Sequence, residues 1–265
     1  MPENPQSMFS DGAAYERLMG RWSRVAGEQF IAWLALPQGL RWLDVGCGNG
    51  AFTEEIVSRC GPAAVTGIDP SEGQISYARN RPGTRMAEFH TGDSQALPFA
   101  DQGFDTATMA LVIAFVPNPA KGVAELARVI RPGGTAAAYM WDLPALSLPL
   151  GPIYRALQDM RMSAPLPPSS EASRLESMAA LWRDAGLEAV ETTVIRVNVA
   201  FDSFEDFWES TTLPAGPHAK FVHALPDAAK QELRRRLRES LPAATDGRIA
   251  YESLANAVKG RRPAR

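Results

Sequence analysis

The sequence is poor in the residues that cross-link a chain or bind metal ions. Its 265 residues include two cysteines and three histidines. Cys47 and Cys60 are too few to cross-link a chain of this length, and they lack the spacing of a metal site. We therefore predict neither a disulfide framework nor a bound metal.

Long apolar runs are also missing. The longest, at residues 109–116, falls far short of the roughly 20 residues that a membrane helix needs. Residues 1–12 are polar and interrupted by proline, unlike a signal peptide. These features predict a cytoplasmic protein with no membrane partner.

Neither sign of charge dominates. The chain carries 27 basic and 30 acidic residues, for a formal net charge of -3. Nucleic-acid-binding domains are usually basic, so this balance argues against a nucleic-acid partner. The basic run at residues 234–238 shares a predicted helix with regularly spaced leucines, which is typical of a solvated helix face.

Short apolar runs alternate with segments of helical spacing. This alternation predicts an α/β fold with a parallel sheet, whose ligands bind beyond the carboxyl ends of the strands. The clearest helix is expected at residues 121–131, ended by Pro132-Gly133-Gly134. The predicted strands are residues 41–45, 64–68, 86–90, 104–110, 135–141, 187–201 and 248–258.

The composition changes after Trp141. Prolines crowd residues 142–170, with one short helix expected near residues 153–160, and a further helix is expected near residues 227–241. We predict N-terminal lid helices in residues 1–36 and a main domain in residues 37–265. Cap insertions are expected within that domain at about 142–170 and 202–245.

The most informative stretch is WLDVGCGNGAF, at residues 42–52. A buried strand leads into three alternate glycines, Gly46, Gly48 and Gly50, and then into a helix. Glycine permits positive φ in such a turn and lets a ligand approach the backbone. The same spacing satisfies the dinucleotide-binding fingerprint, so the glycines alone do not identify the ligand.

Three aspartates narrow the choice. Asp44 precedes the turn, where a carboxylate would repel a pyrophosphate but pair with an ammonium group. Asp69 ends the next strand and can accept hydrogen bonds from ribose hydroxyls. Asp93 follows a third strand, where an adenine amino group can donate to it. These carboxylates predict a ligand with an amine, a ribose and an adenine but no phosphate, which is S-adenosyl-L-methionine.

Four segments resemble the class I S-adenosylmethionine-dependent methyltransferases. They are residues 43–50, 67–69, 92–105 and 125–134. The chain is most similar to the small-molecule branch that contains the ubiquinone and menaquinone biosynthesis enzymes (methyltransferase type 11). The resemblance implies a doubly wound, mostly parallel, seven-stranded Rossmann-like sheet. It also implies in-line methyl transfer to an O, N or C atom of a small molecule, mainly through positioning and desolvation.

The resemblance further implies where ligands bind. The expected cofactor-binding residues are Asp44, Gly46, Cys47, Gly48, Gly50, Asp69, Pro70, Asp93, Ser94, Leu111, Tyr15 and Arg21, with Arg24 as an alternative to Arg21. The expected acceptor pocket contains Trp22, Trp141 and Trp208. Related enzymes often place a histidine soon after the fourth strand, but residues 111–117 contain none. The catalytic residue therefore stays unassigned, with His90, His218 and His223 as candidates.

Three other functions stay open. A nucleic-acid methyltransferase would use the Val116-Pro117-Asn118-Pro119 segment to hold a flipped base, although the aromatic residue expected after it is missing. An NAD-dependent oxidoreductase shares the glycine turn, but no tyrosine is followed four residues later by lysine. A non-catalytic S-adenosylmethionine-binding protein would share every motif. The expected partner is a small molecule, and the chain is expected to be a monomer or homodimer.

Overall fold

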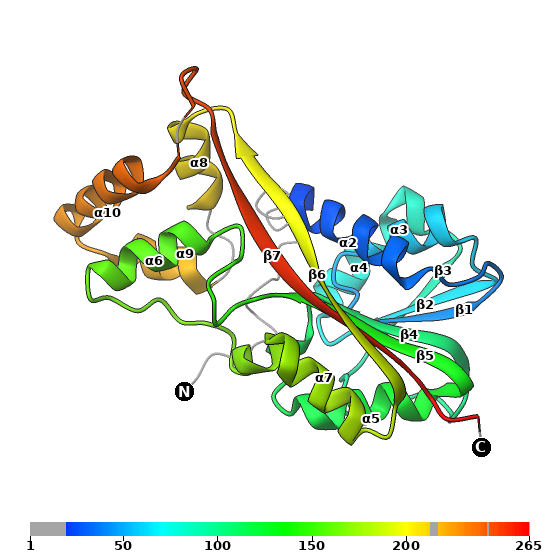
Figure 1. The fold of residues 1–265 in the computed structure, drawn as a ribbon. Helices are drawn as coiled ribbons and strands as arrows, with labels where there is room; N and C mark the ends of the chain where they lie inside the picture. Colours follow the sequence, from blue (N-terminus) through cyan, green and yellow to red (C-terminus); the bar gives the residue numbers. More distant parts are fainter. Residues whose placement is uncertain (1–19, 213–216, 243, 265) are drawn as a thin grey trace.

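The computed structural model describes residues 20–212, 217–242 and 244–264, and a seven-stranded sheet runs through them. The strands follow the order β3-β2-β1-β4-β5-β7-β6 (Figure 1). Their bounds are β1 Arg41–Val45, β2 Ala64–Asp69, β3 Ala87–Thr91, β4 Phe104–Ala110, β5 Ile130–Trp141, β6 Glu188–Phe201 and β7 Ile249–Arg261.

The first five strands are parallel, and β7 runs antiparallel to both β5 and β6. This arrangement confirms the predicted mostly parallel sheet. Four of the five β1 residues are buried, because helices cover both faces of the sheet. Such burial is why β1 reads in the sequence as a continuous apolar run rather than an alternating one.

Helices form a layer on each face of the sheet. In Figure 1, α2, α3 and α4 lie on one side, and α5 and α7 lie on the other. Helix α2 also packs against α3 and β6, and α5 packs against α7. The bounds are α2 Arg21–Leu34, α3 Ala51–Cys60, α4 Glu72–Asn80, α5 Pro119–Val129 and α7 Leu175–Asp184, with 3-10 turns η3 Pro82–Thr84, η4 Ile113–Phe115 and η5 Ser170–Ser173. The two layers confirm the doubly wound architecture.

Helix α5 ends two residues earlier than its spacing predicts. The sequence places the end at residue 131, but α5 ends at Val129 and β5 begins at Ile130. Ile130 already pairs with Phe104 of β4, so its backbone is committed to the sheet. The glycines that follow therefore shape the start of a strand rather than the end of a helix.

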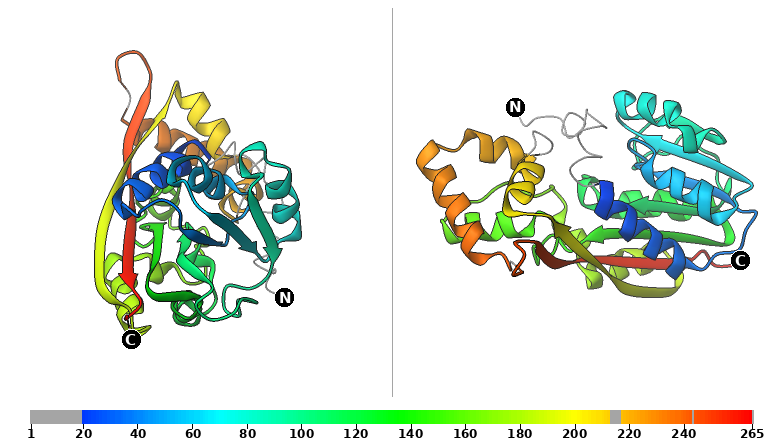
Figure 2. Two further views of the ribbon diagram at one scale, coloured as in Figure 1. Left: turned by 90° about the vertical axis from the view of Figure 1, so that its right-hand side faces the viewer. Right: turned by 90° about the horizontal axis from the view of Figure 1, so that it is seen from above.

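A second group of helices lies beside the long β6–β7 pair, away from the layers on the sheet (Figures 1 and 2). These helices are α6 Gly151–Asp159, α8 Phe204–Thr211, α9 Pro217–Ala224 and α10 Asp227–Ser240. We call this group the cap. Helices α6 and α10 agree with the helices predicted near residues 153–160 and 227–241. The division of the chain into domains stays a prediction.

Candidate active site

A cavity of about 410 Å³ lies at the carboxyl ends of the parallel strands and extends under the cap. Its volume falls within the range of roughly 300–1,000 Å³ that is usual for small-molecule sites. We call the part formed by residues after β1, β2 and β3 the strand end; it contains Gly46–Asn49, Asp69–Ser71 and Gly92–Gln95. The cap end is formed by Leu143, Leu148, Leu150, Tyr154, Leu166, Pro167 and His218.

The glycine turn forms one wall of the strand end. Gly46 has a φ of 76°, and a Cβ atom there would lie 2.5 Å from the Val112 side chain. Gly48 has a φ of 52° and open space where its side chain would be. A ligand can therefore approach the backbone closely at Gly48.

Gly50 differs from the other two glycines. It is the N-cap of α3 with a φ of 80°, and a Cβ atom there would meet Ala78 at 3.1 Å. Gly50 does not line the cavity, contrary to the prediction of a cofactor contact. It is needed because of its positive φ and the tight packing of the turn against Ala78.

Asp69 lines the strand end with its carboxylate held in place by the backbone. Its Oδ2 accepts a hydrogen bond of 3.0 Å from the Gly48 amide, and its Oδ1 accepts one of 2.9 Å from the Ser71 amide. Burial raises the pKa of Asp69, and the two backbone hydrogen bonds oppose that shift. Each carboxylate oxygen has a further lone pair with which to accept a ligand hydroxyl.

Asp44 lies behind the turn and does not line the cavity. It is fully buried, and its Oδ2 accepts a hydrogen bond of 2.7 Å from the Thr53 hydroxyl. Its Oδ1 has no partner among the described residues. The position of Asp44 does not support a direct contact with a cofactor amine, and its expected interaction, directly or through water, stays a prediction.

Asp93 and Ser94 line the cavity as expected, in the loop after β3. Asp93 is exposed, and its Oδ1 accepts a hydrogen bond of 2.9 Å from the Gln95 amide. The backbone amide of Asn118, the N-cap residue of α5, donates a hydrogen bond of 3.0 Å to Oε1 of Gln95. The loop is therefore tied to the helix layer on one side of the sheet.

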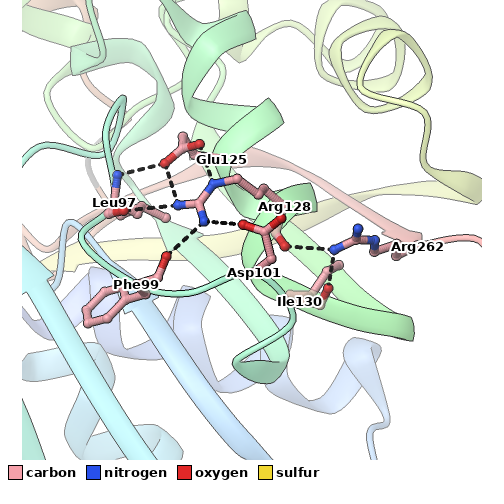
Figure 3. A network of polar contacts seen from close by, with 7 residues as sticks. All are labelled: Leu97, Phe99, Asp101, Glu125, Arg128, Ile130 and Arg262. Atoms are coloured by element: carbon pink, nitrogen blue, oxygen red, sulfur yellow. Dashed lines mark hydrogen bonds and ion pairs between the residues drawn. The ribbon is translucent and has the colours of Figure 1, made fainter.

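Arg128 of α5 fixes the next part of the same loop (Figure 3). Its guanidinium donates to the carbonyl oxygens of Leu97 at 3.0 Å and Phe99 at 2.8 Å, and to Asp101 at 2.7 Å. Glu125 pairs with Arg128 and accepts a hydrogen bond of 2.7 Å from the Leu97 amide. Glu125 and Arg128 therefore hold the loop from α5, although neither residue lines the cavity.

Three further predicted residues line the cavity: Cys47, Pro70 and Leu111. Leu111 has a φ of 62°, an uncommon conformation for a residue with a branched side chain. Its amide donates a hydrogen bond of 2.8 Å to the Tyr139 carbonyl, which anchors the strained turn after β4. Burial raises the pKa of the Cys47 thiol, so it stays uncharged.

The N-terminal helix contributes different residues from those expected. Arg21 lies over the Trp22 ring at 4.3 Å from its centroid and over Phe201 at 4.8 Å. Trp22 is buried against Phe201, with ring centroids 5.1 Å apart. Neither Arg21 nor Trp22 lines the cavity, so the structure does not support these two assignments, which stay predictions. Tyr15 lies outside the described residues.

Two arginines do line the cavity, and each is paired with a glutamate. Arg24 of α2 is 3.1 Å from Glu55, and Arg81 is 2.6 Å from Glu54. Arg81 is not among the residues predicted to bind the cofactor. Arg24 is the predicted alternative to Arg21, and it lines the cavity.

Trp141 lines the cavity, but Trp208 does not. Trp208 is half-buried beside Arg234 of α10, whose guanidinium carbon is 5.7 Å from the ring centroid. The cap side chain that reaches the cavity instead is His218, together with Tyr154 of α6. The spacing of Leu148 and Leu150 in the proline-rich segment is the signal that could have identified the apolar wall.

The other two histidines lie elsewhere. His90 is exposed and packs edge-on against Phe99, with ring centroids 5.4 Å apart. His223 is exposed on α9, and neither histidine lines the cavity. His218 is therefore the histidine candidate that the structure brings to the site.

Neither a membrane span nor a metal centre is found in the part of the chain that the structure describes. None of its helices is both long enough and apolar enough to cross a membrane. Its His, Cys, Asp and Glu side chains form no group of three that could hold a metal ion.

Two curated relatives share part of this sequence. Over 165 residues, or 60% of this chain, it is 34% identical to a fatty-acid O-methyltransferase from Mycolicibacterium smegmatis. Over 156 residues, or 54% of this chain, it is 33% identical to a ubiquinone/menaquinone biosynthesis C-methyltransferase from Geobacter sulfurreducens. The matches span 56% and 59% of the lengths of these relatives.

Solved structures share the fold. One of them is phosphoethanolamine N-methyltransferase 2 from Haemonchus contortus, in complex with S-adenosyl-L-methionine. It superposes on this chain with a TM-score of 0.56 and is 16% identical in sequence. The superposition covers 94% of this chain and 56% of the other. At that identity the likeness concerns the fold alone. The methyltransferase domain family matches residues 43–138, which contain the glycine turn, Asp69 and Asp93. By its sequence motifs and its sheet, the chain resembles the class I S-adenosylmethionine-dependent methyltransferases, and its residues 43–138 match the methyltransferase domain family.

Proposed function

We propose that the protein transfers a methyl group from S-adenosyl-L-methionine to a small molecule with a largely apolar body. One observation carries the proposal: a single cavity joins the glycine turn and Asp69 to the apolar wall of the cap. A cofactor held at the strand end and an acceptor held at the cap end would share this cavity. That arrangement is what a direct transfer between two ligands requires.

The strand end suits the cofactor group by group. Gly48 leaves open space against the backbone, and Asp69 has lone pairs available for the two ribose hydroxyls. Asp93 lies where the resemblance expects the adenine amino group. The Arg24–Glu55 pair presents one positive and one negative group, which complement the carboxylate and ammonium of an α-amino acid.

When bound, S-adenosylmethionine supplies a methyl group on a positively charged sulfur, already activated for displacement. The chain's own contribution is to hold the acceptor in line and to keep water away. The cap end does this with apolar side chains such as Leu148, Leu150 and Leu166. Trp141, at the end of β5, lines the same cavity.

An apolar acceptor is also consistent with the relatives. The protein from Mycolicibacterium smegmatis is named for fatty acids, and the Geobacter sulfurreducens protein for quinone biosynthesis. Burying an apolar molecule against the cap wall would contribute about 25 cal/mol for each Å² removed from water. The proposed acceptor class therefore follows from the wall, with the names of the relatives as support.

Two measurements test the proposal. Calorimetry should show that the protein binds S-adenosylmethionine and not NAD. A lipid extract incubated with isotopically labelled methyl donor should yield label in a product soluble in organic solvent. Binding of NAD, or label confined to added RNA or DNA, would overturn the proposal. Tight cofactor binding with no label in any extract would instead indicate a non-catalytic binding protein.

A further inference from the structure

His218 is a buried polar side chain in an otherwise apolar wall. It is 3% exposed and lies at the start of α9, where it lines the cap end of the cavity. Its Nε2 is 3.0 Å from the carbonyl oxygen of Thr211, at the end of α8. The centroid of its ring lies 6.4 Å from that of Tyr154 of α6.

The Thr211 contact fixes the tautomer of the His218 ring. A carbonyl oxygen can only accept, so Nε2 must carry the hydrogen and donate. In a neutral imidazole the other nitrogen, Nδ1, is then an acceptor with a free lone pair. The structure gives Nδ1 no partner among residues 20–212, 217–242 and 244–264.

The ring is neutral at physiological pH. Burial lowers the pKa of His218 to about 4, and the Thr211 carbonyl opposes this only in part. Tyr154 is the other titratable group of the cap end; burial raises its pKa to about 12, and its hydroxyl donates to the Pro165 carbonyl at 3.4 Å. No other titratable side chain is among the described residues that form the cap end.

We propose that His218 selects acceptors that carry a hydroxyl group, by accepting a hydrogen bond from it at Nδ1. The inference rests on the proposed function and deepens it: the acceptor is an apolar molecule with a neutral alcohol or phenol at the reacting end. A ligand hydroxyl that donates to Nδ1 would form this hydrogen bond among apolar side chains, where a low local dielectric strengthens it.

A carboxylate fits the same place poorly. It has no hydrogen to donate to Nδ1, and it would bring a negative charge to a cap end whose described residues include no cation. The arginines that line the cavity lie outside the cap end: Arg24 is on α2, and Arg81 follows α4. Burying an unpaired charge is far more costly than burying a hydrogen-bonded hydroxyl.

The test compares three ligands of similar shape: 4-hexylphenol, 4-hexylbenzoate and hexylbenzene. Calorimetry on the wild-type protein should give a dissociation constant for the phenol about tenfold lower than for the benzoate. The phenol should also bind about threefold more tightly than hexylbenzene, as expected for one net hydrogen bond. Equal or tighter binding of the benzoate would overturn the inference.

Substitutions locate the effect. His218→Gln can keep the bond to Thr211 but lacks an acceptor at the Nδ1 position, so the preference for the phenol over hexylbenzene should disappear. The matched control is His223→Gln, because His223 also lies on α9 with its Nε2 2.8 Å from a carbonyl, that of Thr212, but outside the cavity. An unchanged preference in His218→Gln would overturn the inference.

A measurement without any substitution covers the case in which His218→Gln does not fold. The chain has three histidines, so their ring nitrogens can be followed by nitrogen NMR in the wild-type protein. Addition of 4-hexylphenol should shift one acceptor-type nitrogen, and hexylbenzene should not. No shift would overturn the inference. If S-adenosylmethionine fails to bind, the proposed function fails; if it binds and the ligand preferences are absent, this inference alone fails.

Discussion

The Asp44 carboxylate accepts a 2.7 Å hydrogen bond from the Thr53 hydroxyl, while its second oxygen is buried without a partner in the described part of the chain. Burial is the main reason that the pKa of Asp44 rises to about 7; the Thr53 bond lowers it, and the charge of Asp69 raises it further. Asp44 therefore changes its charge near neutral pH.

This shift predicts a pH-dependent stability. The unfolded carboxyl has a pKa of 3.8, so between pH 4 and pH 7 the native state holds a proton that the unfolded state has lost. The contribution of Asp44 to stability is complete below about pH 4 and falls as the pH rises to about 7. Asp44→Asn should therefore be more stable than wild type above pH 7, by up to about 4 kcal/mol at 1.36 kcal/mol per pKa unit.

Urea unfolding at pH 5 and pH 8 measures this difference. Asp184→Asn is the control, because Asp184 is an exposed carboxylate at the end of α7. The control should keep the wild-type loss of stability between the two pH values. Asp44→Asn should show a smaller loss, and an identical loss in all three proteins would contradict the assignment.

The close approach of Gly46 to Val112 predicts that a larger residue at position 46 destabilises the protein. A Cβ atom at Gly46 would lie 2.5 Å from Val112, at a φ of 76°. Gly46→Ala should therefore lower the free energy of unfolding by about 2–4 kcal/mol, from backbone strain and overpacking together. Gly39→Ala is the matched control, because Gly39 has a φ of 78° but no atom within 4 Å of the added Cβ.

The control variant Gly39→Ala should lower the free energy of unfolding by about 1 kcal/mol, because it introduces backbone strain without overpacking. The double variant Gly46→Ala/Val112→Ala should recover part of the loss, because it removes the colliding methyl groups. Chemical denaturation of the three variants and the wild-type protein gives the comparison. If Gly46→Ala lowers the free energy of unfolding by no more than Gly39→Ala does, crowding against Val112 does not limit the residue at position 46.

Asp69 should be essential for cofactor binding. Its carboxylate oxygens accept hydrogen bonds from the Gly48 and Ser71 amides. They are also the proposed partners of the two ribose hydroxyls. Asp69→Ala should raise the dissociation constant of S-adenosylmethionine by about 100-fold, the effect of losing two charge-assisted hydrogen bonds. Calorimetry measures it, with Asp184→Ala expected to bind as wild type does. A change below threefold at Asp69 would count against the proposed ribose contact.

Arg128 should support cofactor binding from a distance. It donates to the Leu97 and Phe99 carbonyls and to Asp101, and so holds the loop that carries Asp93. Arg128→Met should reduce the free energy of unfolding by about 2 kcal/mol, since two carbonyls lose their donor. It should also weaken S-adenosylmethionine binding several-fold, without any direct contact.

Arg235→Met is the matched control for that variant. Arg235 also joins two carboxylates, Glu232 and Glu239, but on the exposed face of α10. Exposed pairs of this kind contribute little, so the control should change stability by less than about 1 kcal/mol. Thermal melts measure the stability of both variants, and calorimetry measures their affinity for S-adenosylmethionine. Equal losses in Arg128→Met and Arg235→Met would show that the hydrogen bonds from Arg128 to the loop have no special role.

The strand end of the site could be predicted because its residues follow directly from the strands. In a parallel sheet, strand ends meet at one edge, so Gly46, Asp69 and Asp93 come together once the strands are recognised. The apolar run of β1 was predicted to the residue, Arg41–Val45. Local sequence signals are sufficient where a site is built from the first residues after each strand.

The structure differs from the sequence-based expectations where contacts between distant parts of the chain determine which side chains reach the cavity. Arg21 and Arg24 lie on nearly the same side of α2, and the contact between Trp22 and Phe201 of β6 determines which of them reaches the cavity. No spacing rule places Phe201 beside Trp22. In the same way, Trp208 is held by Arg234 of α10, and that contact exists only once the cap has formed.

The cap end comes from chain that lies beyond the family match, which stops at residue 138. Leu143, Leu148, Tyr154 and His218 all follow that point. Under the proposed function, the choice of acceptor can therefore change during evolution while the residues of the family match stay the same. Two proteins that share residues 43–138 need not share an acceptor, and transplanting the cap segments between relatives should exchange their acceptor preferences while leaving cofactor affinity in place.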